Sequence, residues 1–171
     1  MFHELAPSGF VCFPQRGDDL GERMNLLFED LFIKGYRNIV LIGSDLPGLP
    51  SRFLEEAFHV LEQRGQDLVL GPSRDGGYYL VGLSRSMPEI FNEIPWGGEN
   101  VLMATTQKLT RLGLKAFFLP PWFDIDTPED LQYLESVADQ IALYSHQKIH
   151  GFLKYLAAKK SSGLGGKALN R

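Results

Sequence analysis

Two short apolar segments separated by an amphipathic stretch constrain the fold of this chain most strongly. Residues 38–43 (NIVLIG) and 67–71 (DLVLG) are almost continuously apolar and contain β-branched residues, as is typical of strands covered on both faces. Between them, Ser51 can cap a helix and Gly65 can follow its end. The apolar residues of this helix, at helical spacing, are Phe53, Leu54, Ala57, Phe58 and Leu61. A strand–helix–strand order of this kind predicts two parallel strands joined by a right-handed crossover.

The rest of the chain extends the same alternation. Asp18 or Asp19 can cap a helix that ends before Gly35, and Thr127 followed by Pro128 predicts the start of another. Further expected elements are a strand at 9–13, a loop leading into a strand at 72–83, a helix at 99–112 and a strand at 115–120. We therefore predict an α/β fold of three layers, with a mostly parallel, Rossmann-like sheet and helices on both faces.

Size and charge narrow the class of protein. With 171 residues, 44% of them hydrophobic, the chain has the composition of one domain with a proper core. We predict a domain at residues 1–145, a C-terminal helix at 146–160 and a disordered, glycine-rich tail at 161–171. A net charge of −4 gives no electrostatic footprint for nucleic acid. No apolar segment approaches the roughly 18–20 residues of a membrane span, so we expect a cytoplasmic protein.

Acidic residues follow three of the predicted strands. Asp45 comes after residues 38–43, Asp75 after 67–71, and Asp124 and Asp126 after the last strand. Ligands of open parallel sheets bind beyond the carboxyl ends of the strands, so these carboxylates are expected at one edge. Hard oxygen ligands suit Mg²⁺, which usually fills its octahedron with water and substrate phosphates. The pattern predicts a magnesium site that would accept a phosphorylated ligand.

Each of these acids also has a structural interpretation. Asp45 lies in a proline- and glycine-rich turn and is equally explained as part of that turn, although Ser51 already provides a helix cap. Asp75-Gly76 is a hairpin-turn signal. Asp124 or Asp126 could have only the role of a negative charge that interacts favourably with the dipole of the helix that follows.

Several other kinds of site are excluded or weakly supported. The chain has no G-x-x-x-x-G-K-[S/T] phosphate loop and no G-x-S-x-G nucleophile elbow. The stretch DIDTP differs from the acid pair of dehalogenase-type phosphatases because Pro128 occupies the position of their threonine. His146 and His150 have metal-compatible spacing, but no further ligand lies near them in the sequence.

Five segments together resemble a known family. QRGDDLGERM, VLIGSDLPGLP, GPSRDGGYYLVGL, IPWGGENVL and DIDTPEDL occur in this order between Gln15 and Leu131. They are similar to bacterial glycosyltransferase-like proteins of the GT-A, or nucleotide-diphospho-sugar transferase, fold. That family is related to the guanylyltransferases of molybdenum-cofactor dinucleotide synthesis and to 2-phospho-lactate guanylyltransferase. The resemblance implies a bound Mg²⁺ or Mn²⁺.

The resemblance also implies roles for particular residues. Asp45 would bind the metal and take part in catalysis, Asp124 and Asp126 would be further carboxylates near the metal, and Asp75 would be a catalytic residue on the acceptor side. The residues expected at the nucleotide are Gln15, Gly17, Leu20, Gly43 and Ser44. Those expected at the acceptor are Gly76, Gly77 and Trp96.

The chain departs from the family in its first residues. Members begin with a strand and a basic, glycine-containing phosphate loop, whereas this sequence starts with MFHELAPSGF. We therefore expect the first β-α unit to be absent, which would leave a strand edge uncovered and favour a homo-oligomer.

Two functions stay open at this point. One is an Mg²⁺-dependent transferase, either a nucleotidyltransferase or a glycosyltransferase. Its donor would be a nucleoside triphosphate or a nucleotide-sugar, and its acceptor a small molecule. The other is a non-catalytic remnant of the same fold that acts as a binding or interaction protein.

Overall fold

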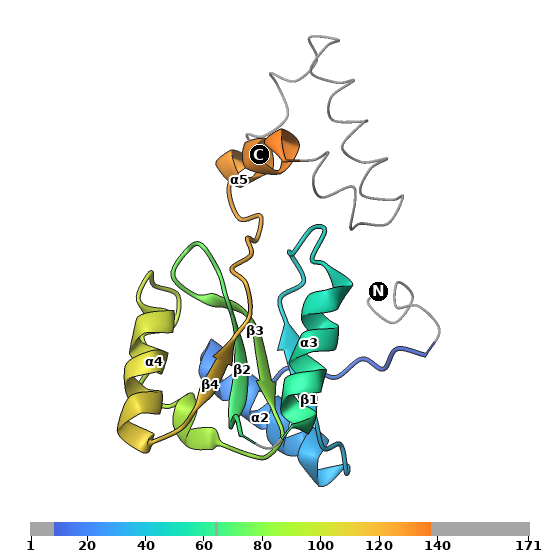
Figure 1. Cartoon of the computed structure of the whole chain (residues 1–171), viewed down its shortest axis with the longest axis vertical. Helices are drawn as coiled ribbons and strands as arrows, with labels where there is room; N and C mark the ends of the chain where they lie inside the picture. The colour runs from blue at the N-terminus through green and yellow to red at the C-terminus, as the bar shows by residue number, and fades with distance from the viewer. Residues whose placement is uncertain (1–8, 64, 138–171) are drawn as a thin grey trace.

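The computed structural model describes residues 9–63 and 65–137, and it contains a four-stranded sheet with helices packed against both faces (Figure 1). The elements, in chain order, are α2 (Leu20–Ile33), β1 (Ile39–Ile42), α3 (Ser51–Glu62), β2 (Leu68–Pro72), β3 (Tyr78–Leu83), the short 3₁₀ helix η1 (Pro88–Ile90), α4 (Val101–Leu112), β4 (Ala116–Phe118) and α5 (Pro128–Ser136).

The sheet is mixed, and the prediction of a mostly parallel sheet is wrong. Its strand order is β1-β3-β2-β4. Strand β3 runs antiparallel to both of its neighbours, and only β2 and β4 form a parallel pair. The loop between β2 and β3 spans only residues 73–77. A parallel connection needs a crossover of a dozen residues or more, so this loop can join only antiparallel strands.

Strands β1 and β2 nevertheless point in the same direction. Leu83 of β3 is the antiparallel partner of Ile39 in β1 and of Leu68 in β2. Helix α3 connects these two strands, as the strand–helix–strand pattern predicts, but β3 lies between them in the sheet. The carboxyl ends of β1, β2 and β4 therefore lie at one end of the sheet.

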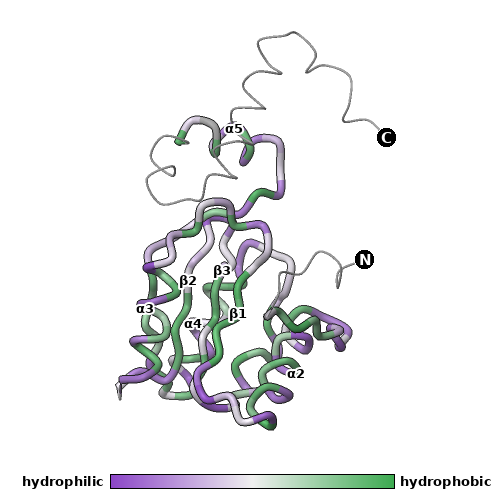
Figure 2. Tube along the Cα trace, turned by 90° about the vertical axis from the view of Figure 1, so that its right-hand side faces the viewer, coloured by the Kyte–Doolittle hydropathy of each residue, from purple (hydrophilic) through white to green (hydrophobic). Residues whose placement is uncertain are grey.

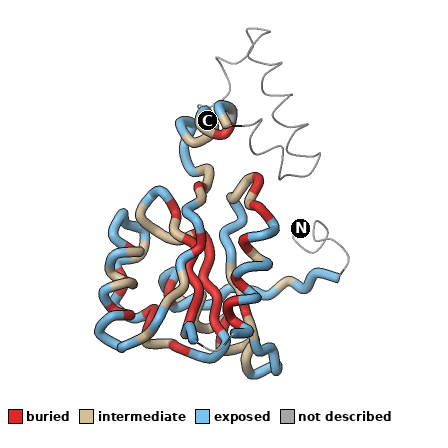
Figure 3. Tube along the Cα trace, viewed as in Figure 1, coloured by how far each residue is buried: buried red, intermediate tan, exposed pale blue. Residues whose placement is uncertain are grey.

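Two apolar clusters hold the layers together. Helices α2 and α4 cover one face, where Phe28 and Leu109 pack with Leu70 and Val81 of the sheet. Helix α3 covers the other face through residues such as Phe53 and Ala57. Buried residues run along the central strands β2 and β3 (Figure 3). Helices on both faces agree with the three-layer prediction.

Local signals set several helix ends. Asp19 caps α2 by accepting a hydrogen bond from the Glu22 amide at 2.8 Å. Thr127 precedes α5, and its hydroxyl accepts from the Asp130 amide at 3.2 Å. The cap at Thr127 was predicted, and Asp19 was one of the two caps considered for α2, but the cap at Ser51 is wrong. Ser51 is the first residue of α3, and Pro50 occupies the cap position without a side-chain hydrogen bond.

The predicted strand at residues 9–13 is also absent. This segment has no strand partner, and Phe10 and Val11 are 72% and 73% exposed. An apolar run of five residues satisfies strand propensity, but a strand also needs a neighbour for its backbone groups.

Part of the predicted domain organisation lies outside the described residues. The boundary at 145, the helix at 146–160 and the tail at 161–171 all fall beyond residue 137. Within residues 9–63 and 65–137, no helix is long and apolar enough to cross a membrane.

Candidate functional site

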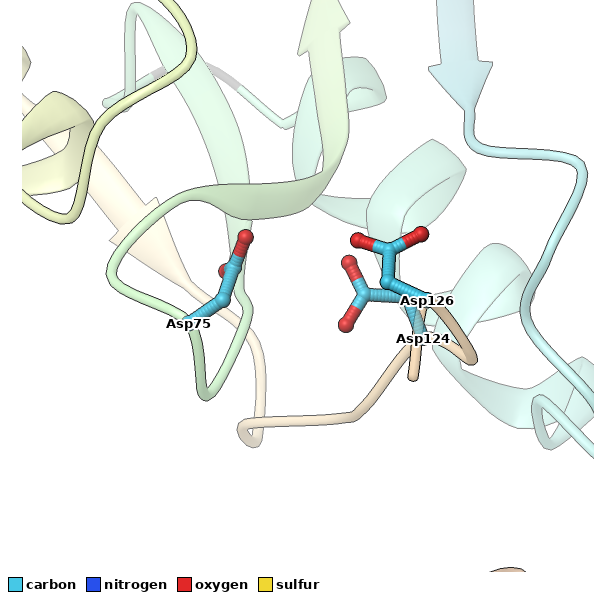
Figure 4. A group of neighbouring side chains, drawn as sticks. All are labelled: Asp75, Asp124 and Asp126. Atoms are coloured by element: carbon cyan, nitrogen blue, oxygen red, sulfur yellow. The ribbon is translucent and has the colours of Figure 1, made fainter. Parts of the chain in front are cut away.

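Three carboxylates meet at the end of the sheet where β2 and β4 finish. Asp75 belongs to the loop between β2 and β3, and Asp124 and Asp126 belong to the segment after β4. One oxygen from each carboxylate can be chosen so that all three lie within 4.8 Å of one another (Figure 4). We call these three residues the aspartate trio. They come from two segments that are about 50 residues apart in sequence.

The segment after β4, which we call the β4 loop (residues 119–127), is fastened to β2. The amide of Leu119 donates to the Leu70 carbonyl at 2.8 Å, and that of Trp122 donates to the Pro72 carbonyl at 3.0 Å. Ser73 and Trp122 form a further parallel bridge beyond the strands proper. These contacts carry the β4 loop along β2 until Asp124 reaches the loop that holds Asp75.

The loop that holds Asp75 is fixed by its glycines. The Gly77 amide donates to the Asp75 carboxylate at 3.0 Å, which sets the direction of that side chain. Gly76 has a φ of +90°, and a Cβ at this position would collide with the carbonyl of Glu99. Its own carbonyl accepts from the Leu102 amide at 2.8 Å. Only glycine satisfies both the backbone angle and the close approach to α4.

Burial and like charge act together on Asp124. Partial burial raises the pKa of its carboxyl, and the nearby negative charges of Asp75 and Asp126 raise it further, while hydrogen bonds to its carboxylate act in the opposite direction. One of these bonds comes from the Ser73 hydroxyl at 3.2 Å. A cation bound between the carboxylates would relieve this repulsion. The trio therefore has the charge and the hard oxygen donors that Mg²⁺ or Mn²⁺ prefers.

Asp45 lies near the trio but does not belong to it. It is part of the turn after β1, which we call the β1 loop (residues 43–50). Its backbone carbonyl accepts from the Ile125 amide at 3.1 Å, so the β1 loop touches the β4 loop. Its carboxylate lies over Gly43, where a Cβ would be 2.8 Å from Oδ1. Of the four acids expected at this edge, three are grouped by the structure and the fourth lies beside them.

A cavity of about 430 Å³ opens next to Asp45 between α2 and β1, and we call it the β1 cavity. Four of the five residues expected at the nucleotide line it, and Arg23 and Tyr78 also contribute to its wall. These four are Gln15, Leu20, Gly43 and Ser44. Gly17, the fifth, is not part of the wall. It has a φ of +125° and its carbonyl accepts from Arg23 Nε at 3.1 Å, so it supports the turn that leads into α2.

A second cavity of about 450 Å³ lies on the other side of Tyr78, and we call it the Trp96 cavity. Trp96, Gly77 and all three members of the trio line it, whereas Gly76 does not. Trp96 is also a structural anchor: its indole N–H donates to the Phe91 carbonyl at 3.3 Å, and its ring meets Tyr78 edge-on. A Cβ on Gly21 would collide with this indole, so α2 packs directly against the cavity wall.

A third cavity, of about 310 Å³, reaches the trio from the side of α5. Arg74 lines it and stacks over the ring of Tyr133, with the guanidinium carbon 4.3 Å from the ring centroid. Neither Tyr78 nor Tyr133 was among the expected site residues. The sequence held one usable signal for Tyr78, which directly follows the Gly76-Gly77 pair, but Tyr133 lies on a helix of ordinary composition.

Comparisons with known proteins agree with this fold. A bacterial family described as "Uncharacterized protein conserved in bacteria (DUF2064)" matches residues 1–98. A crystal structure from Desulfovibrio desulfuricans G20, described as a "putative nucleotide-diphospho-sugar transferase", aligns with a TM-score of 0.76 at 35% sequence identity. The alignment covers 84% of this chain and 62% of that one, so the chain spans less than two thirds of its structural relative. No curated protein matches the sequence.

Proposed function

We propose that this chain, which belongs to the bacterial family DUF2064, is a metal-dependent transferase whose donor is a nucleoside triphosphate or a nucleotide-sugar. The observation that carries the proposal is the aspartate trio, because three carboxylates with oxygens within 4.8 Å of one another repel, and a cation between them would relieve that repulsion. The likeness to a structure described as a nucleotide-diphospho-sugar transferase supports the choice of donor class.

Asp75, Asp124 and Asp126 would hold the ion, and Ser73 would position Asp124 through its hydroxyl. A bound Mg²⁺ or Mn²⁺ would neutralise charge on the phosphates of the donor. The proposal includes a relationship to molybdenum-cofactor and 2-phospho-lactate guanylyltransferases. It leaves two reactions open, nucleotidyl transfer and glycosyl transfer. Both reactions need a diphosphate held beside a cation.

The β1 cavity and the Trp96 cavity, which share Tyr78 in their walls, offer separate places for donor and acceptor. The β1 cavity has an apolar wall from α2 together with Gln15 and Arg23, which suits a base and ribose followed by phosphates. The Trp96 cavity has an aromatic wall and opens directly onto the trio, which suits an acceptor. Asp75 lines this second cavity, and the oxygen of its carboxylate that does not hold the ion is our candidate for the group that accepts the acceptor's proton.

Thermal unfolding tests the proposal. The wild-type chain is heated with Mg²⁺ or Mn²⁺, alone and with each of GTP, CTP, UTP, ATP and the corresponding nucleotide-sugars. A ligand present at one hundred times its Kd adds about 2.7 kcal/mol to the free energy of unfolding. We expect one base to raise the melting temperature only when the metal is present.

Asp124→Asn and Glu129→Gln provide a matched pair for this experiment. Both remove one negative charge from the same end of the molecule, but Glu129 is an exposed residue of α5 outside the trio. We expect Asp124→Asn to abolish the metal-dependent rise and Glu129→Gln to keep it. A rise that is followed by no transfer when candidate small-molecule acceptors are added would favour the non-catalytic binding protein. Equal behaviour of the two variants would overturn the metal site.

A further inference from the structure

The two edges of the sheet differ in how they are protected. Strand β4 has only three residues, follows Lys115 and is followed at once by Leu119 and two prolines. Charges, prolines and short length are the devices by which proteins prevent edge strands from pairing with other chains. Strand β1 reads Ile-Val-Leu-Ile, with neither a charge nor a proline. It is the open edge of the described sheet.

Backbone groups of β1 point outward along this edge. The Gly43 amide donates to the Tyr79 carbonyl of β3 at 3.1 Å, so the alternate residues Leu41 and Ile39 also direct their N–H and C=O groups to β3. The backbone groups of Val40 and Ile42 therefore face away from β3. No described strand lies on that side, and Figure 2 shows β1 between α3 and α2 along the facing edge.

Apolar side chains accompany this open backbone. Ile42 is 49% exposed although it belongs to a strand of the sheet. On α3, Phe53 is buried against Tyr79 and Trp122. Phe58 lies five residues later, about 140° round the helix and therefore away from this buried contact. It is 41% exposed. The edge thus combines unpaired backbone with apolar surface.

Charges at the two ends of β1 complement each other. Arg37 precedes the strand and Asp45 follows it, and both side chains are exposed. When two copies of β1 pair antiparallel, the start of one strand lies beside the end of the other. Arg37 of each copy then lies at the same end of the paired strands as Asp45 of the other copy. The dimer therefore contains two such pairings of opposite charge. Parallel pairing would instead bring like charges together.

We propose that the chain forms a homodimer in which two β1 strands pair antiparallel about a two-fold axis and join the sheets into one of eight strands. The axis is perpendicular to the sheet, so the α3 helices of the two copies lie on the same face of the joined sheet. Such an interface is isologous and closed, because each copy offers the same edge and uses it once. It also brings the positively charged Arg37 side chain of each copy to the β1 loop of the other.

Light scattering coupled to size exclusion tests the dimer. The wild-type chain is expected to show twice its monomer mass at tens of micromolar, and to dissociate on dilution. Ile42→Lys places a charge on the β1 edge and is expected to raise the dimer Kd at least ~10-fold. Phe118→Lys is the matched control, because Phe118 is 44% exposed on the opposite edge strand, and it is expected to keep the wild-type Kd.

A charge exchange tests the antiparallel arrangement. Arg37→Glu should weaken the dimer, and Arg37→Glu combined with Asp45→Arg should restore it. Circular dichroism and melting temperature establish that each variant is folded. A monomeric wild-type protein, an assembly larger than a dimer, or a dimer broken by Phe118→Lys rather than by Ile42→Lys would overturn the proposal. Failure of the double variant to recover would overturn the antiparallel arrangement.

Discussion

The β1 loop and the β4 loop bring acids to the same end of the sheet, but they are held differently. The β4 loop makes repeated backbone contacts with β2, and the Ser73 hydroxyl donates to Asp124. The β1 loop is linked to this region through one backbone hydrogen bond, from Ile125 to the Asp45 carbonyl. The carboxylates that lie close together are thus Asp75, in the loop that continues β2, and Asp124 and Asp126, whose segment runs along β2. A site that binds a small ion with fixed geometry needs this kind of support.

The largest effect is expected when the support of Asp75 is broken. Gly76→Ala would force a Cβ against the Glu99 carbonyl at a φ of +90°, so we expect a loss of about 3 kcal/mol in the free energy of unfolding. Urea denaturation measures it. Gly113→Ala is the control: Gly113 also has a positive φ, of +68°, but nothing lies within 4 Å of its Cβ position. A loss equal to that of the control would contradict the collision.

Ser73→Ala tests the fastening of Asp124 itself. Loss of the hydroxyl removes a hydrogen bond to the carboxylate, and changes of this kind beside metal ligands cost about 10–100-fold in metal affinity. We expect a fall in Mn²⁺ affinity of about 10-fold, measured by calorimetry. Ser84→Ala, at an exposed position, should leave the affinity unchanged. An unchanged affinity in Ser73→Ala would show that the hydroxyl does not position Asp124.

Asp45→Asn tests whether the acid of the β1 loop takes part in metal binding. Because the Asp45 carboxylate lies outside the trio, we expect Mn²⁺ affinity to fall less than in Ser73→Ala, by less than about 10-fold. The stabilisation by nucleotide together with metal should fall by more than the stabilisation by metal alone. If Asp45→Asn instead matched Asp124→Asn in its loss of Mn²⁺ binding, Asp45 would be a metal ligand and the two loops would be equivalent.

The smallest effect concerns pH. The raised pKa of Asp124 means that the folded protein holds this proton more tightly than the unfolded chain, so the group lowers stability as pH rises from its ordinary value through the raised one. Without metal, Asp124→Asn should therefore gain a small amount of melting temperature relative to wild type as the pH rises above the ordinary pKa of an aspartate, about 4. Melting curves in metal-free buffer measure the difference. A variant that loses stability over this range would contradict the sign of the shift.

Local chemistry determined what could be predicted from sequence. The caps at Asp19 and Thr127 depend on residues three positions away; Thr127 was predicted, and Asp19 was predicted as an alternative to Asp18. The apolar runs of β1 and β2 were recognised for the same reason. The sheet was predicted to be mostly parallel although the Asp75-Gly76 turn signalled a hairpin, because that turn was weighed only as an alternative to a functional loop. This turn is a hairpin loop between β2 and β3, and it also contains Asp75, a member of the trio.

Long-range packing explains the rest. That Asp75 joins Asp124 and Asp126, while Asp45 lies outside, follows from how the β4 loop runs along β2, and no local pattern encodes that path. The position of Tyr78 between two cavities depends on its contact with Trp96, 18 residues away. The expected grouping of acids at one end needed only that β1, β2 and β4 share a direction, which they do.

The insertion of β3 between β1 and β2 also fixes the order in which the sheet can be completed. About 40 residues separate the end of β1 from the end of β3, which corresponds to ~2–8 s of synthesis on the ribosome. During that interval the nascent β1 has no strand to pair with, because its neighbour in the finished sheet has not yet been made. Closure of the β2–β3 hairpin then supplies β3, which pairs with β1 as well as with β2. Assembly of the sheet therefore waits on a single late hairpin.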